Sequence, residues 1–194
     1  MRKVAVIATA SGCGKTTVGR ALAGALEVPF VELDAIHWQA GWTELDADEL
    51  RLRVEPLVER DSWVIDGSYR GKLGDLVLER ADTVVWLDLP REVWLPRLVV
   101  RTLRRAITRE ELWNGNRESL WSAFAPTDSL LRFALANDRR RRHRYPRELA
   151  RFRVARLRTP AEVEAFLRSA RRRERSSATH AAPRRPSQIG VRTT

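Results

Sequence analysis

The sequence feature that most constrains the fold is a short run of small residues between an apolar segment and an amphipathic one. The run is Thr9-Ala-Ser-Gly-Cys-Gly-Lys-Thr-Thr17. Residues 3–8 before it are almost entirely apolar and rich in β-branched side chains, which is typical of a buried parallel strand. Residues 15–26 after it carry apolar side chains at helical spacing. A buried strand, a glycine-rich turn and a helix in this order indicate an α/β fold.

The same run has the residue types that bind phosphate. It fills the last three positions of the pattern G-x-x-x-x-G-K-[ST], whereas Thr9 replaces the first glycine. Gly12 and Gly14 allow backbone N–H groups to turn toward phosphate oxygens, and the following helix adds its dipole. Lys15 is expected to bridge the β- and γ-phosphates, and Thr16 to offer its hydroxyl to Mg²⁺. The predicted nucleotide-binding residues of this loop are Thr9, Ala10, Ser11, Gly12, Cys13, Gly14, Lys15, Thr16 and Thr17.

The alternative for this run is a flexible turn that only caps a helix. Strand, loop and helix lie where phosphate binding needs them, and Lys15 is one of three lysines beside 33 arginines. We therefore favour the phosphate-binding loop.

Strands and helices alternate along the rest of the chain. Further strands are expected at residues 28–34, 62–66, 82–88 and 152–157, and further helices at 46–60, 91–105, 120–141 with a break near Pro126, and 160–173. This alternation predicts a P-loop NTPase fold with about five mainly parallel strands flanked by helices. We expect one domain over residues 1–168, with a helical lid at about 102–118. Residues 169–194 are rich in Arg, Ser, Pro and Ala, and we expect a disordered basic tail there.

The formal net charge of +11 over 194 residues is unevenly distributed. Residues 1–96 hold 11 Lys or Arg against 16 Asp or Glu, residues 97–167 hold 17 against 8, and residues 168–194 hold 8 against 1. The tail thus contributes +7 and the remaining chain only +4. A basic total of this kind is typical of nucleic-acid binding, but its distribution argues more for a bound triphosphate.

Composition excludes several other classes. The single cysteine excludes an internal disulfide framework, and the three histidines lack metal-ligand spacing. No apolar run reaches the roughly 18–20 residues of a membrane span, and the N-terminus lacks a signal peptide. We expect a soluble cytoplasmic protein without a membrane partner; its oligomeric state cannot be read from the sequence.

Two aspartates follow predicted strands, where an open parallel sheet places its ligands. Asp66 is the better candidate for holding Mg²⁺ through water. Asp34 is the better candidate for contacting an acceptor or serving as its base. Each could instead be a helix cap or a turn residue.

Basic and aromatic side chains complete the predicted site. Arginines that could clamp phosphates are Arg70, Arg97, Arg101, Arg104 and Arg105, with a solvated helix face as the alternative. Trp38, Trp42 and Tyr69 could stack on a planar or sugar-like acceptor, with core packing as the alternative, whereas Trp63, Trp86 and Trp94 are expected to pack. Residues 139–142 are four arginines that form either a nucleic-acid patch or a solvated surface.

Over about residues 3–168, the chain resembles nucleoside-monophosphate and related small-molecule kinases. The resemblance rests on Asp66-Gly-Ser-Tyr-Arg70, Leu87-Asp-Leu-Pro90, the pair Arg97 and Arg101, and Arg158-Thr-Pro-Ala-Glu-Val163. It implies that the arginine pair leads into a mobile lid and that Arg158 lies near the nucleotide base. Ser68-Tyr69 stands where adenylate kinases have Phe-Pro, which weakens the expectation of AMP as the acceptor.

A narrower resemblance is to bacterial proteins labelled adenylate-kinase-like ATPases or DNA-topology-modulation proteins. It rests on Leu33-Asp-Ala-Ile-His-Trp38, Gly41-Trp42, residues 63–69, residues 101–105 and Leu112-Trp-Asn-Gly-Asn-Arg-Glu118. We expect an ATP- and Mg²⁺-dependent kinase that phosphorylates a nucleotide-like or other hydroxyl metabolite. Lys15, Arg101, Asp34 and Asp66 are its predicted catalytic residues. The alternative is a regulatory or nucleic-acid-associated ATPase.

Overall fold

A five-stranded parallel sheet forms the centre of the molecule, as the alternation of strands and helices predicted. The computed structural model describes residues 1–117 and 130–181. The strand order is β2-β5-β1-β6-β7, and every pairing in this sheet is parallel. The strands are β1 (Lys3–Ala8), β2 (Phe30–Glu32), β5 (Trp63–Asp66), β6 (Thr83–Leu87) and β7 (Val154–Leu157).

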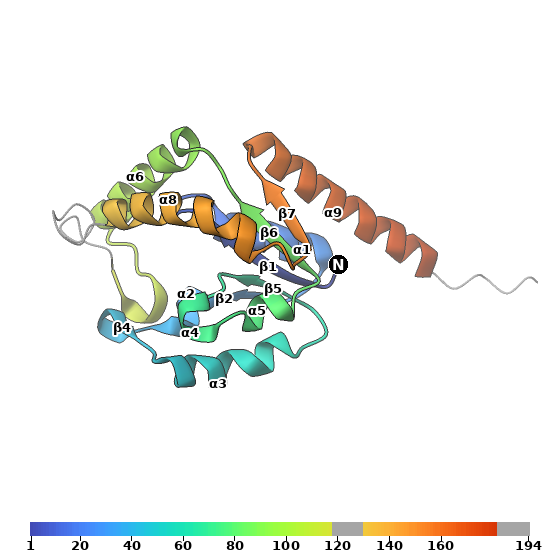
Figure 1. The fold of residues 1–194 in the computed structure, drawn as a ribbon, viewed down its shortest axis with the longest axis horizontal. Coiled ribbons are helices and arrows are strands. Elements are labelled where there is room, and N and C mark those ends of the chain that lie inside the picture. The colour runs from blue at the N-terminus through green and yellow to red at the C-terminus, as the bar shows by residue number, and fades with distance from the viewer. Residues whose placement is uncertain (118–129, 182–194) are drawn as a thin grey trace, which may run out of the picture.

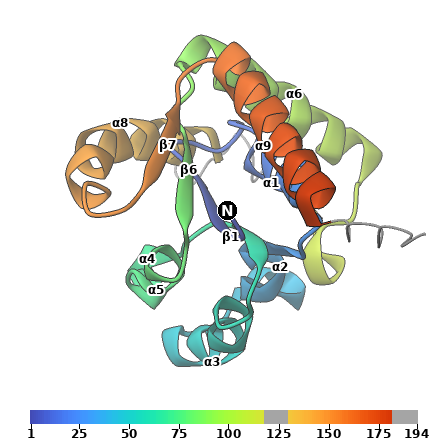
Figure 2. The same ribbon diagram turned by 90° about the vertical axis from the view of Figure 1, so that its right-hand side faces the viewer.

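Helices cover both faces of the sheet. The longer ones are α1 (Lys15–Leu26), α3 (Ala47–Val58), α6 (Arg91–Thr108), α8 (Leu130–Glu148) and α9 (Pro160–Ala181). The short ones are α2 (Leu33–His37), α4 (Arg70–Leu73) and α5 (Leu76–Glu79). Figure 1 shows the sheet between these layers, and Figure 2 shows α1 and α9 on one face with α4, α5 and α8 on the other.

The alternation of side chains along the strands explains this layering. On β1, Val4 and Val6 belong to the apolar cluster that includes α1 and α9, whereas Ala5 and Ile7 belong to the cluster that includes α3 and the end of α8. Because successive residues of a strand face opposite sides, one continuous apolar strand serves both layers. Trp63, Trp86 and Trp94 are buried, as expected for packing residues.

Parallel register brings the carboxyl ends of three strands together, and this positions the site. Asp66 at the end of β5 is paired with Val6 of β1 and with Glu32 of β2. β1 then continues into the glycine-rich loop that precedes α1. The loop and the two carboxylates therefore meet at one edge of the sheet, where open α/β sheets bind their ligands.

The C-terminal helix corrects the expected boundary of the tail. α9 continues to Ala181, whereas we expected disorder from residue 169. Ala170 is 2% exposed and packs into the cluster that contains α1, and the surrounding arginines and alanines favour helix. Residues 182–194 and the expected break near Pro126 lie outside the described residues. No helix in the described part of the chain is long and apolar enough to cross a membrane.

The connections near the site differ most from expectation. Strand β2 is shorter than predicted because α2 begins at Leu33, and it is followed by a two-stranded hairpin, β3 (Trp38–Gln39) and β4 (Thr43–Glu44). Two short 3₁₀ turns, η1 (Ala40–Trp42) and η2 (Trp113–Gly115), contact one another. Of the expected lid, the structure places residues 102–108 in α6 and residues 109–117 in the segment that follows, and Glu118 is outside the described residues.

Candidate active site

The predicted phosphate loop borders an open cavity of about 2530 Å³. The predicted site residues that line this cavity are Ala10, Ser11, Gly12, Cys13, Gly14, Lys15, Thr16, Thr17, Asp34, Trp38, Tyr69, Arg70, Arg97, Arg101 and Arg105. Asp66 lies beneath its floor, in contact with Lys15 and Thr16. Residues from the first half of the chain and from α6 and α8 thus surround one space.

The loop conformation requires its two glycines. Gly12 and Gly14 have φ angles of +86° and +84°, a region that residues with a side chain rarely adopt. A Cβ on Gly12 would lie 2.6 Å from the carbonyl oxygen of Trp94, so α6 packs directly on the loop backbone. A Cβ on Gly14 would meet nothing within 4 Å. No side chain caps the N-terminus of α1, which leaves its N–H groups available for an anion.

Thr9 has a different role from the one we predicted. Its side chain is fully buried, and its hydroxyl lies 3.0 Å from the carbonyl oxygen of Leu87 and 3.2 Å from Oδ1 of Asp88. It does not line the cavity described here. The hydroxyl ties the end of β1 to the end of β6, which explains why a threonine replaces the first glycine of the pattern.

Lys15 and Thr16 converge on the same buried carboxylate. Nζ of Lys15 lies 3.0 Å from Oδ1 of Asp66, and the Thr16 hydroxyl donates to Oδ2 at 2.6 Å. Burial opposes the charge on Lys15, but the carboxylates of Asp66 and Asp34 outweigh it and raise its pKa. Lys15 therefore stays protonated, as a phosphate-binding lysine must.

Glu32 is a site residue that the sequence analysis missed. Its Oε1 lies 3.3 Å from the Thr16 hydroxyl, because register places Glu32 beside Asp66. Burial and the neighbouring charges of Asp66 and Asp34 raise its pKa. Its position within the predicted strand 28–34 could have indicated it, since the carboxyl end of that strand faces the loop.

The donors around Thr16 fit Mg²⁺ held jointly with phosphate oxygens. Within residues 1–117 and 130–181, no group of three or more His, Cys, Asp or Glu side chains could hold a metal ion. A hydroxyl next to one buried carboxylate is nevertheless what a nucleotide-bound Mg²⁺ requires, because that ion keeps several waters and takes its other ligands from phosphates. Thr16 and Asp66 are the residues that would hold it.

Tyr69 orients Asp34, and both residues line the cavity. The Tyr69 hydroxyl donates to Oδ1 of Asp34 at 2.6 Å. Tyr69 is the residue just before α4, and it adopts a strained left-handed backbone conformation with φ of +43°. Burial and the carboxylate of Asp34 raise the pKa of the Tyr69 phenol far above its usual range. The phenol therefore remains a proton donor to Asp34.

The predicted arginines line the cavity from two elements. Arg97, Arg101, Arg104 and Arg105 line it from α6, where Arg104 and Arg105 pair with Glu110. Arg70 also lines it, and its guanidinium is paired with Asp75 and Glu148. Arg158 is exposed and is not among the cavity-lining residues, so the structure does not bring it to the site.

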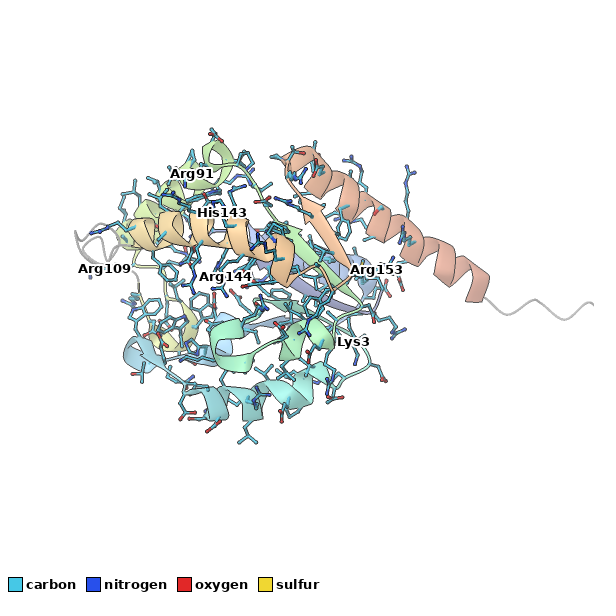
Figure 3. All side chains as sticks on the ribbon, in the orientation of Figure 1. Lys3, Arg91, Arg109, His143, Arg144 and Arg153 are labelled. Carbon is cyan, nitrogen blue, oxygen red and sulfur yellow. The ribbon has the colours of Figure 1, made fainter. Side chains whose placement is uncertain are left out.

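The arginine run at 139–142 is divided between two structural roles. Arg142 pairs with Asp88 and Asp138, two carboxylates that are almost completely buried. Arg141 lines the cavity and donates to the carbonyl oxygens of Ala8 and Thr9, at the start of the loop. Arg144, labelled below α8 in Figure 3, also lines the cavity. Helical spacing could have separated these arginines and paired Arg142 with Asp138, but its other partner, Asp88, lies 54 residues away in the sequence.

Three tryptophans form an aromatic wall, Trp38, Trp42 and Trp113, and all three line the cavity. The ring centroids of Trp38 and Trp42 lie 5.5 Å apart and those of Trp42 and Trp113 lie 6.5 Å apart, both edge to face. Asn116 joins the two segments: it donates to the carbonyl oxygen of Gln39 and accepts from the backbone N–H of Trp42, each at 2.8 Å. The sequence analysis missed Trp113 in this wall.

Comparisons with known proteins agree with the loop and the fold. The shikimate kinase family model matches residues 11–42. A protein of Bacillus subtilis (strain 168) named Uncharacterized protein YqaC is 30% identical over 107 residues, which are 54% of this chain and 60% of that protein. Shikimate kinase 2 of Escherichia fergusonii is 44% identical over 52 residues, 27% of this chain and 24% of that enzyme. These matches thus span less than two thirds of either relative.

The structural likeness extends over almost the whole chain. A gluconokinase from Sinorhizobium meliloti 1021 superposes with a TM-score of 0.51 and 23% identity, covering 94% of this chain and 98% of that one. The chain therefore has the α/β fold of P-loop kinases, as its resemblance to that group implied. The matched residues 11–42 include residues 11–17 of the predicted phosphate loop, Asp34 and two tryptophans of the aromatic wall.

Proposed function

We propose that this chain is an ATP-dependent kinase that transfers the γ-phosphoryl group of ATP to a hydroxyl group of a small molecule. The observation that carries the proposal is the placement of Lys15 and Asp34 around one cavity. Lys15 and the loop supply a binding site for phosphates, and Asp34, held by Tyr69, supplies a carboxylate that can accept a proton. A phosphate site and a candidate base that share one space are what phosphoryl transfer requires.

The loop holds the donor in this proposal. Backbone N–H groups at the start of α1 surround the phosphates, and the ammonium of Lys15 exchanges its contact with Asp66 for phosphate oxygens. Thr16 and Asp66 hold Mg²⁺, which when bound neutralises part of the phosphate charge. Arg97, Arg101 and Arg105 lie on the cavity wall formed by α6, where they stabilise the charge of the transferred group.

The acceptor reacts at Asp34. Its hydroxyl proton passes to the carboxylate of Asp34 as the oxygen forms a bond to the γ-phosphorus. The bond between that phosphorus and the β–γ bridging oxygen breaks, and ADP leaves with the electron pair. The hydrogen bond from Tyr69 fixes the orientation of the carboxylate, which favours transfer over hydrolysis by water.

The comparisons support a small polyhydroxylated acceptor. The family model and one curated relative are named for shikimate kinase, and a solved structure with this fold is a gluconokinase. Both names refer to phosphorylation of small alcohols. The internal pairing of Arg142 with Asp88 and Asp138 removes one arginine of the run at 139–142 from any nucleic-acid patch.

A panel of acceptors tests this proposal. ADP release is measured with shikimate, gluconate, nucleosides and nucleoside monophosphates, with and without Mg²⁺, and transfer of label from γ-labelled ATP identifies the phosphorylated product. We expect at least one small alcohol to stimulate ADP release and to take up the label. Stimulation by DNA or RNA, with label recovered only as inorganic phosphate, would favour the nucleic-acid-associated ATPase instead.

A further inference from the structure

The aromatic wall joins two segments that are more than seventy residues apart. Residues 38–42 contribute two of its rings, and the segment after α6 contributes Trp113. Beyond the two contacts of Asn116 described above, the side-chain amide of Asn114 donates to the carbonyl oxygen of Trp38 at 2.5 Å, and the Trp42 indole N–H donates to that of Arg117 at 3.3 Å. These bonds hold the rings in place before any ligand arrives.

The geometry of the rings makes a corner that a flat molecule can enter. Neighbouring rings meet at interplanar angles of 79° and 84°, so the wall presents faces that are nearly perpendicular to one another. Trp42 is 38% exposed, whereas Trp38 and Trp113 are half-buried. An exposed indole in a cavity binds planar rings well, because stacking hides apolar area from water.

The wall adjoins the candidate base. Asp34 lies in α2, and Trp38 is the residue that follows this helix. Residues four apart lie on the same side of a helix, so Asp34 and Trp38 are neighbours. The ring of His37 contacts both Trp38 and Tyr69, with centroid distances of 5.0 and 4.5 Å, and Tyr69 holds Asp34. A molecule whose hydroxyl reaches Asp34 therefore lies with its body against the wall.

The two cations that residues 34–75 contribute to the lining of the cavity are already paired with carboxylates. Between residues 34 and 75, the cations that line the cavity are Arg70 and Lys72. Arg70 is paired with Asp75 and Glu148, and Lys72 lies 2.7 Å from Oε2 of Glu44. A carboxylate or phosphate on the acceptor would have to displace protein carboxylates from Arg70 or Lys72, at a cost in desolvation. Arg144, which also lines the cavity, is held by Glu148 as well.

We infer that the acceptor is an uncharged alcohol that carries a planar ring, of the nucleoside type, and that its ring packs into the corner formed by Trp38, Trp42 and Trp113. This inference rests on the proposed kinase function and specifies the acceptor at the same site. The hydroxyl is placed at Asp34 by stacking rather than by an ion pair. Trp113 is then a substrate-binding residue, and Asn116 positions it.

Matched acceptors that differ in one phosphate group test the inference. Uridine is compared with UMP, and cytidine with CMP, and both pairs with shikimate and gluconate, by transfer of label from γ-labelled ATP. We expect kcat/KM for the nucleoside to exceed that for its monophosphate and those for the two acids by at least about tenfold. Binding of ATP, measured separately by calorimetry, verifies that the donor site is intact in every sample.

Variants of the wall provide the second part of the test. Trp113→Ala is expected to raise KM for the nucleoside about tenfold or more, the usual cost of losing one stacked ring. Trp113→Phe keeps a ring and should recover most of that loss, and neither should change the affinity for ATP. Leu52→Ala, at a side chain 72% exposed on α3, is the control for nonspecific effects.

The outcomes separate this inference from the kinase proposal. If shikimate, gluconate or a monophosphate is the better acceptor, or if Trp113→Ala leaves KM for the acceptor unchanged, the inference is wrong and the kinase proposal stands. If ATP binds but no acceptor takes up label, both are wrong.

Discussion

Nζ of Lys15 lies 3.0 Å from Oδ1 of Asp66, and the carboxylate of Asp66 is 1% exposed. This contact joins the first turn of α1 to the end of β5 and holds the ammonium at the floor of the cavity. The same carboxylate accepts the hydroxyl of Thr16. Asp66 thus fixes, before nucleotide binds, two side chains that the proposed reaction uses.

The first prediction concerns Asp66→Asn, which keeps the shape of the side chain but removes its charge. We expect the rate of ADP release to fall about 100-fold, a typical cost of losing one electrostatic group in a site. The Mg²⁺ concentration for half-maximal rate should rise as well. Asp61→Asn, at an exposed position, is the control. An unchanged Mg²⁺ dependence in Asp66→Asn would show that Asp66 does not help to hold the ion.

The second prediction concerns Arg101, a partly buried arginine that lines the cavity from α6. Arg101→Ala should lower kcat by about 100-fold or more, because the guanidinium acts on charge that develops during transfer. The Kd for ATP should change by less than about threefold. Arg153→Ala is a matched control, since this exposed arginine precedes β7 at the other end of the strands (Figure 3). A loss confined to ATP affinity would assign Arg101 to ground-state binding alone.

The third prediction separates the two glycines of the loop. Both have positive φ, so alanine at either position costs about 1–2 kcal/mol in backbone strain. At Gly12 the added Cβ also meets the carbonyl oxygen of Trp94 at 2.6 Å, and relieving this clash adds about 1–3 kcal/mol. Urea unfolding should therefore show a larger loss of stability for Gly12→Ala than for Gly14→Ala. Equal losses would mean that α6 moves away from the loop at no cost.

The sequence predicts the loop and the sheet well because their signals are local. The strand at 3–8 and the helix at 15–26 are found where they were expected, since continuous apolar runs and helical periodicity are read from neighbouring residues. The hairpin at 38–44 was missed because its strands have only two residues each. The disordered tail was expected too early, from residue 169, because the tertiary packing of Ala170 is invisible in a local pattern.

The candidate site is predictable in its residue types but not in its pairings. Arg70 was expected to be available for phosphate, but Glu148, 78 residues later, neutralises it. Thr9 was assigned to the nucleotide on motif position, whereas its hydroxyl donates to Leu87, the last residue of β6, and lies 3.2 Å from Asp88, which follows it. Such partners depend on strand order and register, which no local pattern contains.

The fourth prediction is a pH dependence of stability due to His37. This histidine is almost completely buried, and burial, together with the positive charge of Lys72, lowers its pKa although Glu44 opposes the shift. The folded protein thus favours neutral His37, whereas the unfolded chain binds a proton near its ordinary pKa of about 6.5. His37 therefore contributes stability above that pH, and this contribution is lost as the pH falls below it.

Urea unfolding at about pH 7.5 and about pH 5.5 measures this effect. In His37→Gln the difference in free energy of unfolding between the two pH values should be smaller than in the wild type. His143→Gln is the matched control, because His143 is exposed on α8 (Figure 3) and should leave the difference unchanged. If His37→Gln and the wild type lose equal stability on acidification, other groups account for the pH dependence.

The most direct test of the proposed kinase activity is transfer of label from γ-labelled ATP to an acceptor by the wild type and by Lys15→Ala. The account predicts that the wild type labels a small alcohol and that Lys15→Ala reduces this transfer by at least about 100-fold while it stays folded by circular dichroism. Transfer by Lys15→Ala at the wild-type rate would contradict the assignment of the loop.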